Sequence, residues 1–224
     1  MSSVLLINPN SSEATTAMMV GIARACAPAG ITVVGASATR GPAMIVDAEA
    51  LAASADEVIE IGMREAVRHA GIIVGAFGDP GLAQLRKLLA IPVVGLCEAA
   101  MLEASAGGRR FGVATVTPLL AGPIGQRAID LGLAQTYTGI RLTAGDPVAL
   151  AADPALLEER LAQAVTECIE QDGAQVVIIG GGPLGRAAAA LAPRFAVPIV
   201  APIPAALRRL AGLLGLTVQH TVQQ

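Results

Sequence analysis

The sequence contains few aromatic residues and no long apolar run. Its 224 residues include no tryptophan, one tyrosine and three phenylalanines, which argues against an aromatic surface for stacking nucleic-acid bases. The formal net charge of −3 argues against a protein that binds a phosphate backbone. Mean hydropathy is high, at +0.63, yet no uninterrupted apolar segment approaches the ~20 residues that span a bilayer. No basic segment precedes the first apolar stretch, so we expect no secretory signal and a cytoplasmic location.

Cysteine and histidine are also scarce. The cysteines Cys26, Cys97 and Cys168 are widely spaced and form no CxxC pair, so neither a disulfide framework nor a structural zinc site is indicated. The two histidines, His69 and His220, lie far apart in the sequence. This weakens the case for a histidine-based triad or a histidine-ligated metal, and we expect no metal site.

Short apolar runs alternate along the chain with alanine-rich segments of helical length. The runs lack the alternation of half-exposed strands, and their near-continuous apolar character is typical of parallel strands buried on both faces. We expect strands at residues 4–7, 31–34, 72–76, 92–96, 111–115, 176–179 and 198–200. We expect helices at residues 12–28, 47–69, 81–90, 118–131, 154–171, 187–191 and 205–214. This order predicts an α/β fold with parallel sheets.

One pattern occurs twice in the chain. Residues 71–94 and 175–200 each contain an apolar strand, a glycine-rich turn with a proline, a short helix and a strand that opens with proline. Ala76 and Gly181 occupy equivalent places in the two turns. The repeat predicts two similar three-layer α/β lobes, the first formed by residues 1–111 with the tail 217–224 and the second by residues 112–216. The turns then lie at the carboxyl ends of their strands, where open α/β sheets bind ligands.

The first candidate site segment is Asn8-Pro9-Asn10-Ser11-Ser12, which follows a predicted strand. Its amides and hydroxyls can donate hydrogen bonds to an anion at the start of the next helix. The alternative is an ordinary strand–helix turn in which one of the two serines caps the helix.

Two carboxylates follow other predicted strands. Asp79 is the one charged side chain in the loop 75–81, where it either caps the following helix or acts as a base. Glu98 either contacts the substrate and exchanges a proton or is a first-turn helix glutamate favoured by the helix dipole. We expect the neighbouring Cys97 to be a small buried core residue.

Hydroxyls and glycines complete the candidate site. Thr115 and Thr117 lie on the same side if the strand continues, so two donors could hold one carboxylate, although threonine also simply suits a strand end. The turn at residues 180–183 offers backbone amides but no reactive side chain. Pro183 breaks a GxGxxG pattern and no Walker-type motif occurs, so we expect no nucleotide cofactor.

Together these segments resemble the Asp/Glu racemase superfamily, and within it the hydantoin and allantoin racemase branch. The matching stretches cover nearly the whole chain in order: Ile7-Asn-Pro-Asn-Ser-Ser12, Thr39-Arg-Gly-Pro42, Phe77-Gly-Asp-Pro-Gly-Leu82, Gly95-Leu-Cys-Glu-Ala-Ala100, Gly112-Val-Ala-Thr-Val-Thr117 and Pro198-Ile-Val-Ala-Pro202. The resemblance implies two lobes related by pseudo-twofold symmetry and a cofactor-free active site in the cleft between them. It implies that the substrate's carboxylate or imide edge binds to Asn10, Thr115 and Thr117. The other residues that we expect at the substrate are Phe77, Gly78, Gly181, Gly182 and Pro183.

The resemblance also implies a pair of catalytic cysteines that this chain lacks. Racemases of the family use two thiols on opposite sides of the substrate carbon, and by motif alignment these belong at Ala76 and Gly181. A methyl group and a hydrogen carry no proton, so the two-thiol mechanism is not available. The alternatives are proton transfer through Asp79 or Glu98, a single-thiol reaction through Cys97, or binding without turnover.

The sequence therefore predicts a cofactor-independent enzyme of the racemase superfamily with a mechanism other than two-thiol exchange. The expected substrate is a small amino-acid-derived carboxylate, imide or hydantoin-like compound. A decarboxylase, a cyclic-amide hydrolase or a non-catalytic carboxylate-binding protein on the same fold are the alternatives. The alanine-rich, weakly charged helices favour a homo-oligomer.

Overall fold

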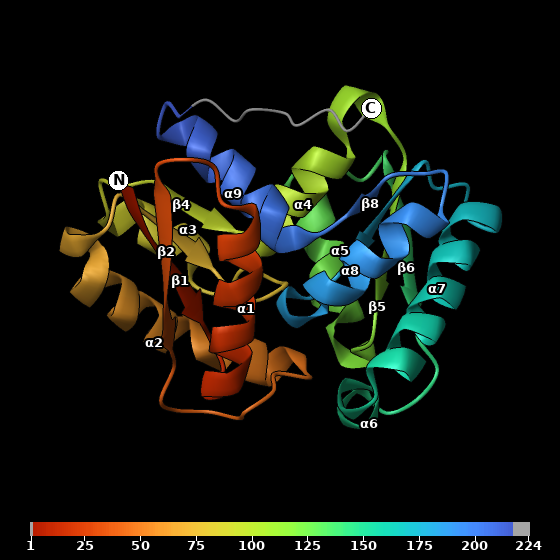
Figure 1. Cartoon of the computed structure of the whole chain (residues 1–224), viewed down its shortest axis with the longest axis horizontal. Helices are drawn as coiled ribbons and strands as arrows, with labels where there is room; N and C mark the ends of the chain where they lie inside the picture. The colour runs from red at the N-terminus through yellow and green to blue at the C-terminus, as the bar shows by residue number, and fades with distance from the viewer. Residues whose placement is uncertain (1, 217–224) are drawn as a thin grey trace.

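Two four-stranded parallel sheets frame the computed structural model, which describes residues 2–216 (Figure 1). The first sheet has the order β2-β1-β3-β4 and the second the order β6-β5-β7-β8. The strands of the first are β1 (Ser2–Asn8), β2 (Ile31–Ser37), β3 (Gly71–Val74) and β4 (Val93–Gly95). Those of the second are β5 (Phe111–Thr115), β6 (Tyr137–Leu142), β7 (Val176–Ile179) and β8 (Ile199–Val200). The order of strands is the same in both lobes, so the predicted α/β fold with two similar lobes is confirmed.

Helices cover both faces of each sheet, which is why the strands are apolar throughout. The outer helices of the first lobe are α2 (Ala48–Glu65) and α3 (Leu82–Leu88), and those of the second are α6 (Pro147–Ala152), α7 (Pro154–Glu170) and α8 (Gly185–Leu191). Between the sheets lie α1 (Glu13–Cys26), α4 (Leu96–Ala104), α5 (Ala121–Asp130) and α9 (Pro202–Leu213). Short 3₁₀ helices are η1 (Ala66–Arg68), η2 (Ala106–Gly108), η3 (Pro118–Leu120), η4 (Gly182–Leu184) and η5 (Ala192–Arg194). None of the described helices is long and apolar enough to cross a membrane.

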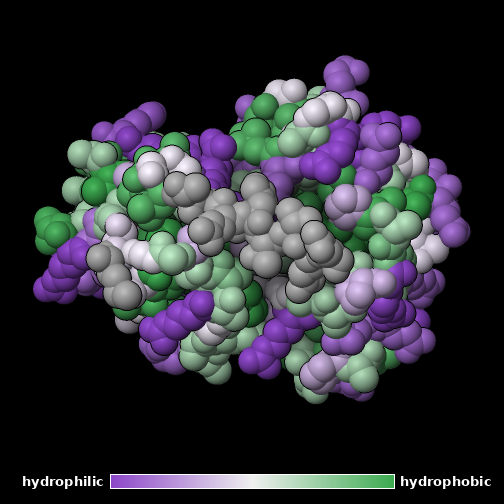
Figure 2. Space-filling model, turned by 45° about the horizontal axis from the view of Figure 1, so that its top comes forward, coloured by the Kyte–Doolittle hydropathy of each residue, from purple (hydrophilic) through white to green (hydrophobic). Residues whose placement is uncertain are grey.

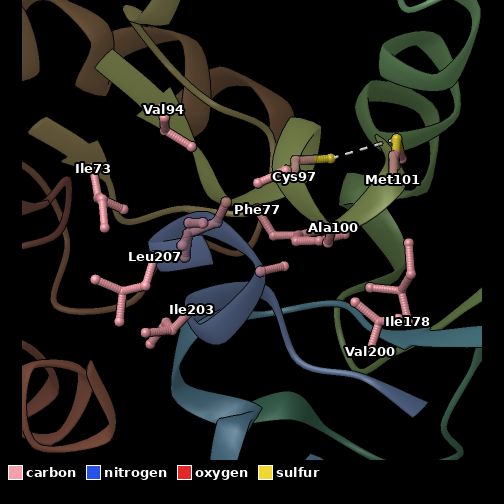
Figure 3. Close-up of a cluster of buried hydrophobic side chains, with 14 of the residues drawn as sticks. Ile73, Phe77, Val94, Cys97, Ala100, Met101, Ile178, Val200, Ile203 and Leu207 are labelled. Carbon is pink, nitrogen blue, oxygen red and sulfur yellow. Dashed lines mark hydrogen bonds between the residues drawn. The ribbon is translucent and has the colours of Figure 1, made fainter. Parts of the chain in front are cut away.

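One continuous hydrophobic core joins the two lobes. It contains side chains from the inward face of each sheet, such as Ile73 of β3 and Ile178 of β7, together with residues of α4 and α9 (Figure 3). One further, separate cluster lies under the outer helices of each lobe. Because the central core belongs to both lobes, removing core side chains there would loosen the boundary at which the candidate site lies.

Three elements were not among the expected strand and helix ranges, although α4 agrees with the alternative that Glu98 lies in the first turn of a helix. The helix α4 follows β4 with no loop, and seven of its residues are buried, so it shows no amphipathic stripe. The strand β6 is half-exposed at the edge of its sheet and contains Gly139 at φ 123°, which weakens the apolar pattern. The short helix α6 begins at Pro147, capped by Asp146.

The helix α9 returns from the second lobe to the first. It follows β8 directly but packs against α1, α4, β3 and β4. Residues 202–213 were expected in the second lobe, whereas the structure places this helix on the first sheet's inner face. The tail 217–224 lies outside the described residues, and the division into domains stays a prediction. Figure 2 shows apolar side chains interspersed with hydrophilic ones over both lobes on the face it presents.

Candidate active site

A cavity of about 130 Å³ lies between the lobes, at the carboxyl ends of both sheets. Its floor is formed by the residues that directly follow four strands, two from each sheet. These residues are Asn8, Pro9 and Asn10 after β1, Gly75, Ala76 and Phe77 after β3, Thr115, Val116 and Thr117 after β5, and Gly180, Gly181, Gly182, Pro183 and Leu184 after β7. Parallel strands of equivalent position in the two lobes thus present their ends to one space.

The segment after β1 is held by the side chain of Asn8. This buried amide donates from Nδ2 to Asn10 Oδ1 at 2.7 Å and to Thr16 Oγ1 at 2.9 Å, and its Oδ1 accepts from the Asn10 backbone N–H at 3.2 Å. Asn10 Oδ1 also accepts from the Ser12 backbone N–H at 3.0 Å. With its oxygen fixed by two donors, Asn10 has Nδ2 left to donate to a ligand. Ser12 caps α1, so the capping alternative holds for this serine.

The two threonines after β5 play different parts. Thr115 is fully buried, and its Oγ1 donates to the Gly180 carbonyl at 2.5 Å, which ties the end of β5 to the turn after β7. Thr117 lines the cavity, and its hydroxyl makes no hydrogen bond with any residue from 2 to 216. The expected pair of free hydroxyl donors is therefore reduced to one, that of Thr117.

The glycine-rich turns of the two lobes meet at the cavity. A Cβ on Gly182 would lie 2.6 Å from Met19 Sδ and 3.3 Å from the Gly75 carbonyl oxygen, so only glycine lets these turns approach. The backbone N–H groups of Ala76, Phe77, Gly181 and Gly182 have no acceptor within the described chain. Each lobe thus supplies two backbone donors next to the cavity.

An apolar wall faces these polar groups. Both lobes contribute to it, through the loop before α2, through α2 itself, and through η3 and the helices α5, α6 and α7. The wall residues are Met44, Ile45, Leu51, Leu120, Ile124, Pro147, Ala151 and Leu157. The sequence analysis missed them because apolar residues of a cavity wall follow the same helical spacing as core residues. Asn8 was part of the first candidate segment, but the sequence did not indicate that its side chain would hold that segment in place.

No ionisable side chain lines the cavity within residues 2–216. The polar side chains in its lining are two asparagines and two threonines. An ion that entered would lose its hydration without meeting an opposite charge, which is costly in an apolar site. The cavity therefore suits a neutral ligand with several hydrogen-bond acceptors.

Asp79, a predicted catalytic residue, lies outside the cavity lining and caps α4. Its Oδ1 accepts from the Cys97 backbone N–H at 2.9 Å and its Oδ2 from that of Glu98 at 2.8 Å. Arg127 Nε lies 3.3 Å from the same Oδ2. Burial raises the pKa of Asp79 from 3.8 to about 6, against the lowering effect of these hydrogen bonds and of Arg127. The expected cap on the following helix is not found, because α3 has no side-chain cap and Asp79 caps α4 instead. Since Asp79 does not line the cavity, no contact supports a catalytic role.

Glu98, the second predicted catalytic residue, is surrounded by arginines. Arg86 binds it through two nitrogens at 2.9 and 3.0 Å, and Arg127 Nη2 lies 2.7 Å from its Oε2. Arg209 Nη2 lies 3.4 Å from its Oε1. Glu98 does not line the cavity. Its oxygens are held by structural partners, so the structure offers no path by which it would reach a ligand.

The cysteines lie away from the cavity. Cys97 is fully buried with Sγ 3.9 Å from Met101 Sδ (Figure 3), and burial raises the pKa of its thiol well above the usual value. Burial also raises the pKa of Cys168 to about 12. Cys26 is exposed on α1. Thiolates are the reactive form, so the two buried cysteines suit core packing, as expected for Cys97.

The remaining predicted residues are placed as follows. Asn10, Phe77, Thr115, Thr117, Gly181, Gly182 and Pro183 all line the cavity. Gly78 does not, but a Cβ there would lie 2.6 Å from Leu51 Cδ2, so this glycine lets the wall residue Leu51 approach. Ala76 and Gly181, where the resemblance places the two thiols, line the cavity from opposite lobes.

Comparisons with known proteins match this arrangement over nearly the whole chain. Residues 4–210 match the family described as Asp/Glu/Hydantoin racemase. A hydantoin racemase of Paenarthrobacter aurescens is 31% identical over 219 residues, which cover 96% of this chain and 92% of that one. The chain belongs to the Asp/Glu/hydantoin racemase family. The predicted superfamily and its hydantoin racemase-like branch are thereby confirmed.

Two solved structures of the family have closely similar folds. An allantoin racemase from Klebsiella pneumoniae has a TM-score of 0.90 and 27% identity, covering 99% of this chain and 92% of its own. An allantoin racemase from Pseudomonas fluorescens has a TM-score of 0.89 and 25% identity, covering 98% and 94%. The expectation of a racemase-family enzyme is confirmed by these relatives. Within this family member, the roles of individual residues stay predictions.

Proposed function

We propose that this racemase-family enzyme binds a neutral five-membered ring of the hydantoin type and exchanges the hydrogen on ring carbon C5 with solvent. The observation that carries this proposal is a cavity rich in hydrogen-bond donors whose described lining holds no ionisable side chain. Relatives named as hydantoin and allantoin racemases support the same substrate class.

The lining favours a cyclic ureide over a free amino acid. An amino acid carries an ammonium and a carboxylate, and burying either without a counter-charge is strongly unfavourable. A hydantoin is neutral and presents two carbonyl oxygens and two N–H groups. Donors for the oxygens are Asn10 Nδ2, the Thr117 hydroxyl and the backbone N–H groups of the two glycine-rich turns. The apolar wall accommodates a hydrocarbon substituent on C5.

The reaction follows from the acidity of the C5–H bond beside a carbonyl group. A hydroxide ion from solvent takes the proton and becomes water, and the electron pair of the C–H bond moves to the carbonyl oxygen as an enolate. The backbone N–H groups of the two glycine-rich turns are the donors available to stabilise the developing charge. A water molecule on either face then returns a proton to C5 and regenerates hydroxide, which racemises the carbon. Solvent supplies the base and the proton, and the chain supplies the hydrogen-bond donors, so the proposed reaction uses no cofactor.

The experiment is deuterium exchange of enantiopure 5-isobutylhydantoin in D₂O, followed by loss of the C5–H proton signal and by polarimetry. We expect the protein to accelerate both above buffer at the same rate. Thr117→Val keeps the shape of the side chain and removes a donor, so it is expected to slow exchange about tenfold or more. Thr166→Val is the matched control, because Thr166 lies on α7 and donates to the Ala162 carbonyl away from the cavity.

Two results would contradict the proposal. Tight binding of the hydantoin with no exchange above buffer would make the protein a binding module. Release of a ring-opened product or of CO₂ from a carboxylated analogue, without exchange at C5, would make it a hydrolase or a decarboxylase. Homo-oligomerisation and a cytoplasmic location remain separate predictions.

A further inference from the structure

A buried cluster of five charged side chains connects the two lobes beside the cavity. The carboxylates of Asp79 and Glu98 belong to the first lobe and are 1% and 4% exposed. Arg86 of α3 and Arg209 of α9 contact Glu98 from the same lobe. Arg127 is the one member that comes from α5, on the second sheet, and it contacts both carboxylates.

Arg127 is also connected to both walls of the cavity. One helical turn before it on α5, Ile124 lines the cavity from the second lobe. The partner of Arg127 in the first lobe, Asp79, lies in the same turn as Ala76 and Phe77. The Asp79 backbone N–H donates to the Ala76 carbonyl at 3.2 Å. Asp79 has φ 55°, the only positive φ of a non-glycine residue in the described chain. Such a conformation persists only where its surroundings hold it.

The contacts of Asp79 fix the start of α4. No side chain of its own caps this helix, because residue 95 is a glycine, and a Cβ there would collide with the Asp79 carboxylate. Asp79 instead accepts the backbone N–H groups of Cys97 and Glu98. Arg127 is the only cation that the described residues place on Asp79, whereas Glu98 has two others.

We infer that Arg127 is a positioning residue that holds the 75–81 turn against α5 and so fixes the separation of the two cavity walls. Without its guanidinium, Glu98 keeps two arginines and Asp79 keeps none. A buried carboxylate without its cation is strongly unfavourable, so the turn would shift to let water reach it. The backbone donors of Ala76 and Phe77 would move with the turn. The part of this inference that concerns ligand binding rests on the proposed function.

The test compares Arg127→Met and Arg127→Lys with Arg141→Met. Arg141 binds the single carboxylate of Asp172 through two nitrogens, at 2.8 and 2.6 Å, and is similarly exposed. Both residues belong to the second lobe and do not line the cavity. Lysine at position 127 reaches only one of the two carboxylates, because it lacks the planar fork of arginine. It serves as the folded variant if the methionine substitution abolishes folding.

The first measurement is hydrogen–deuterium exchange by mass spectrometry, which needs no ligand. We expect Arg127→Met to accelerate exchange at least tenfold at the hydrogen-bonded amides of residues 75–81, which are those of Gly75 and Asp79, and at the amides of Cys97 and Glu98. Arg127→Lys should give a smaller increase at the same amides. Arg141→Met should leave them unchanged.

The second measurement is the affinity for 5-isobutylhydantoin by calorimetry, with at least tenfold weaker binding expected for Arg127→Met and no change for Arg141→Met. Unchanged exchange in residues 75–81 would overturn the inference, as would an increase spread evenly over the chain. If the unaltered protein does not bind the hydantoin, the proposed function fails, and the exchange result alone decides the role of Arg127.

Discussion

The buried carboxyl group of Asp79 gives the protein an unusual dependence of stability on pH, which Asp79→Asn removes. Burial raises the pKa of this group from 3.8 to about 6 in the folded protein. Between these values the folded protein binds the proton more tightly than the unfolded chain does. Protonation therefore stabilises the folded state, and this contribution is present at low pH and lost as the pH rises through about 6.

The size of the effect follows from the two pKa values. A rise from 3.8 to about 6 corresponds to about 3 kcal/mol of unfolding free energy. The free energy of unfolding of the wild type, minus that of Asp79→Asn, is expected to fall by about this amount between about pH 3 and about pH 8. The asparagine keeps the shape of the side chain and an oxygen acceptor for one amide of α4, but it does not titrate.

The assay is urea unfolding at a series of pH values, followed by far-ultraviolet circular dichroism because the chain contains no tryptophan. Asp172→Asn is the control of opposite sign. The hydrogen bond from Arg141 lowers the pKa of Asp172, so its contribution to stability is present at neutral pH and lost on acidification. A difference for Asp79→Asn that stays level, or rises with pH, would show that Arg127 and the α4 amides outweigh burial, and would refute the reasoning.

Three further predictions concern the cavity. Thr115→Val removes the hydroxyl that donates to the Gly180 carbonyl, so it should lower the free energy of unfolding by about 1–3 kcal/mol in urea titrations. Gly182→Ala places a Cβ 2.6 Å from Met19 Sδ, so it should lower the free energy of unfolding by about 1–3 kcal/mol and weaken hydantoin binding. The control is Gly212→Ala, whose Cβ has no atom within 4 Å and which should leave binding unchanged. Ala76→Cys places a thiol in the cavity and should add to the hydroxide-dependent rate of C5–H exchange a second contribution, which levels off once that thiol is ionised.

The buried strands could be predicted from the sequence, because strands covered on both faces are apolar at nearly every position. For the same reason α4 was not predicted as a helix. It is buried on nearly all sides and so has no apolar stripe, and the predicted strand was therefore extended to Leu96. The strand β6 was also not predicted, because it is an edge strand that mixes Thr138, Gly139 and Arg141 with apolar residues. Strands buried on both faces were thus predictable, whereas a helix buried on nearly all sides and a half-exposed edge strand were not.

The polar half of the candidate site could also be predicted, because turns after parallel strands are identified by their own residues. The apolar half could not, since Ile124 and Leu157 carry no signal that separates a cavity wall from a core. The environment of Asp79 was equally hidden, because its cation Arg127 lies 48 residues away in the sequence. The spacing of residues in the sequence gives no indication that Arg127 pairs with the carboxylate of Asp79.

The dependence on pH of C5 deuteration is the most direct test of a cavity without a side-chain base. For unaltered protein and 5-isobutylhydantoin in D₂O buffers from pH 6 to pH 8, we predict that kcat/KM increases tenfold for each pH unit without levelling off, since the base is solvent hydroxide. A profile that levels off within this range would reveal a titrating group of the protein at the substrate and would contradict the account.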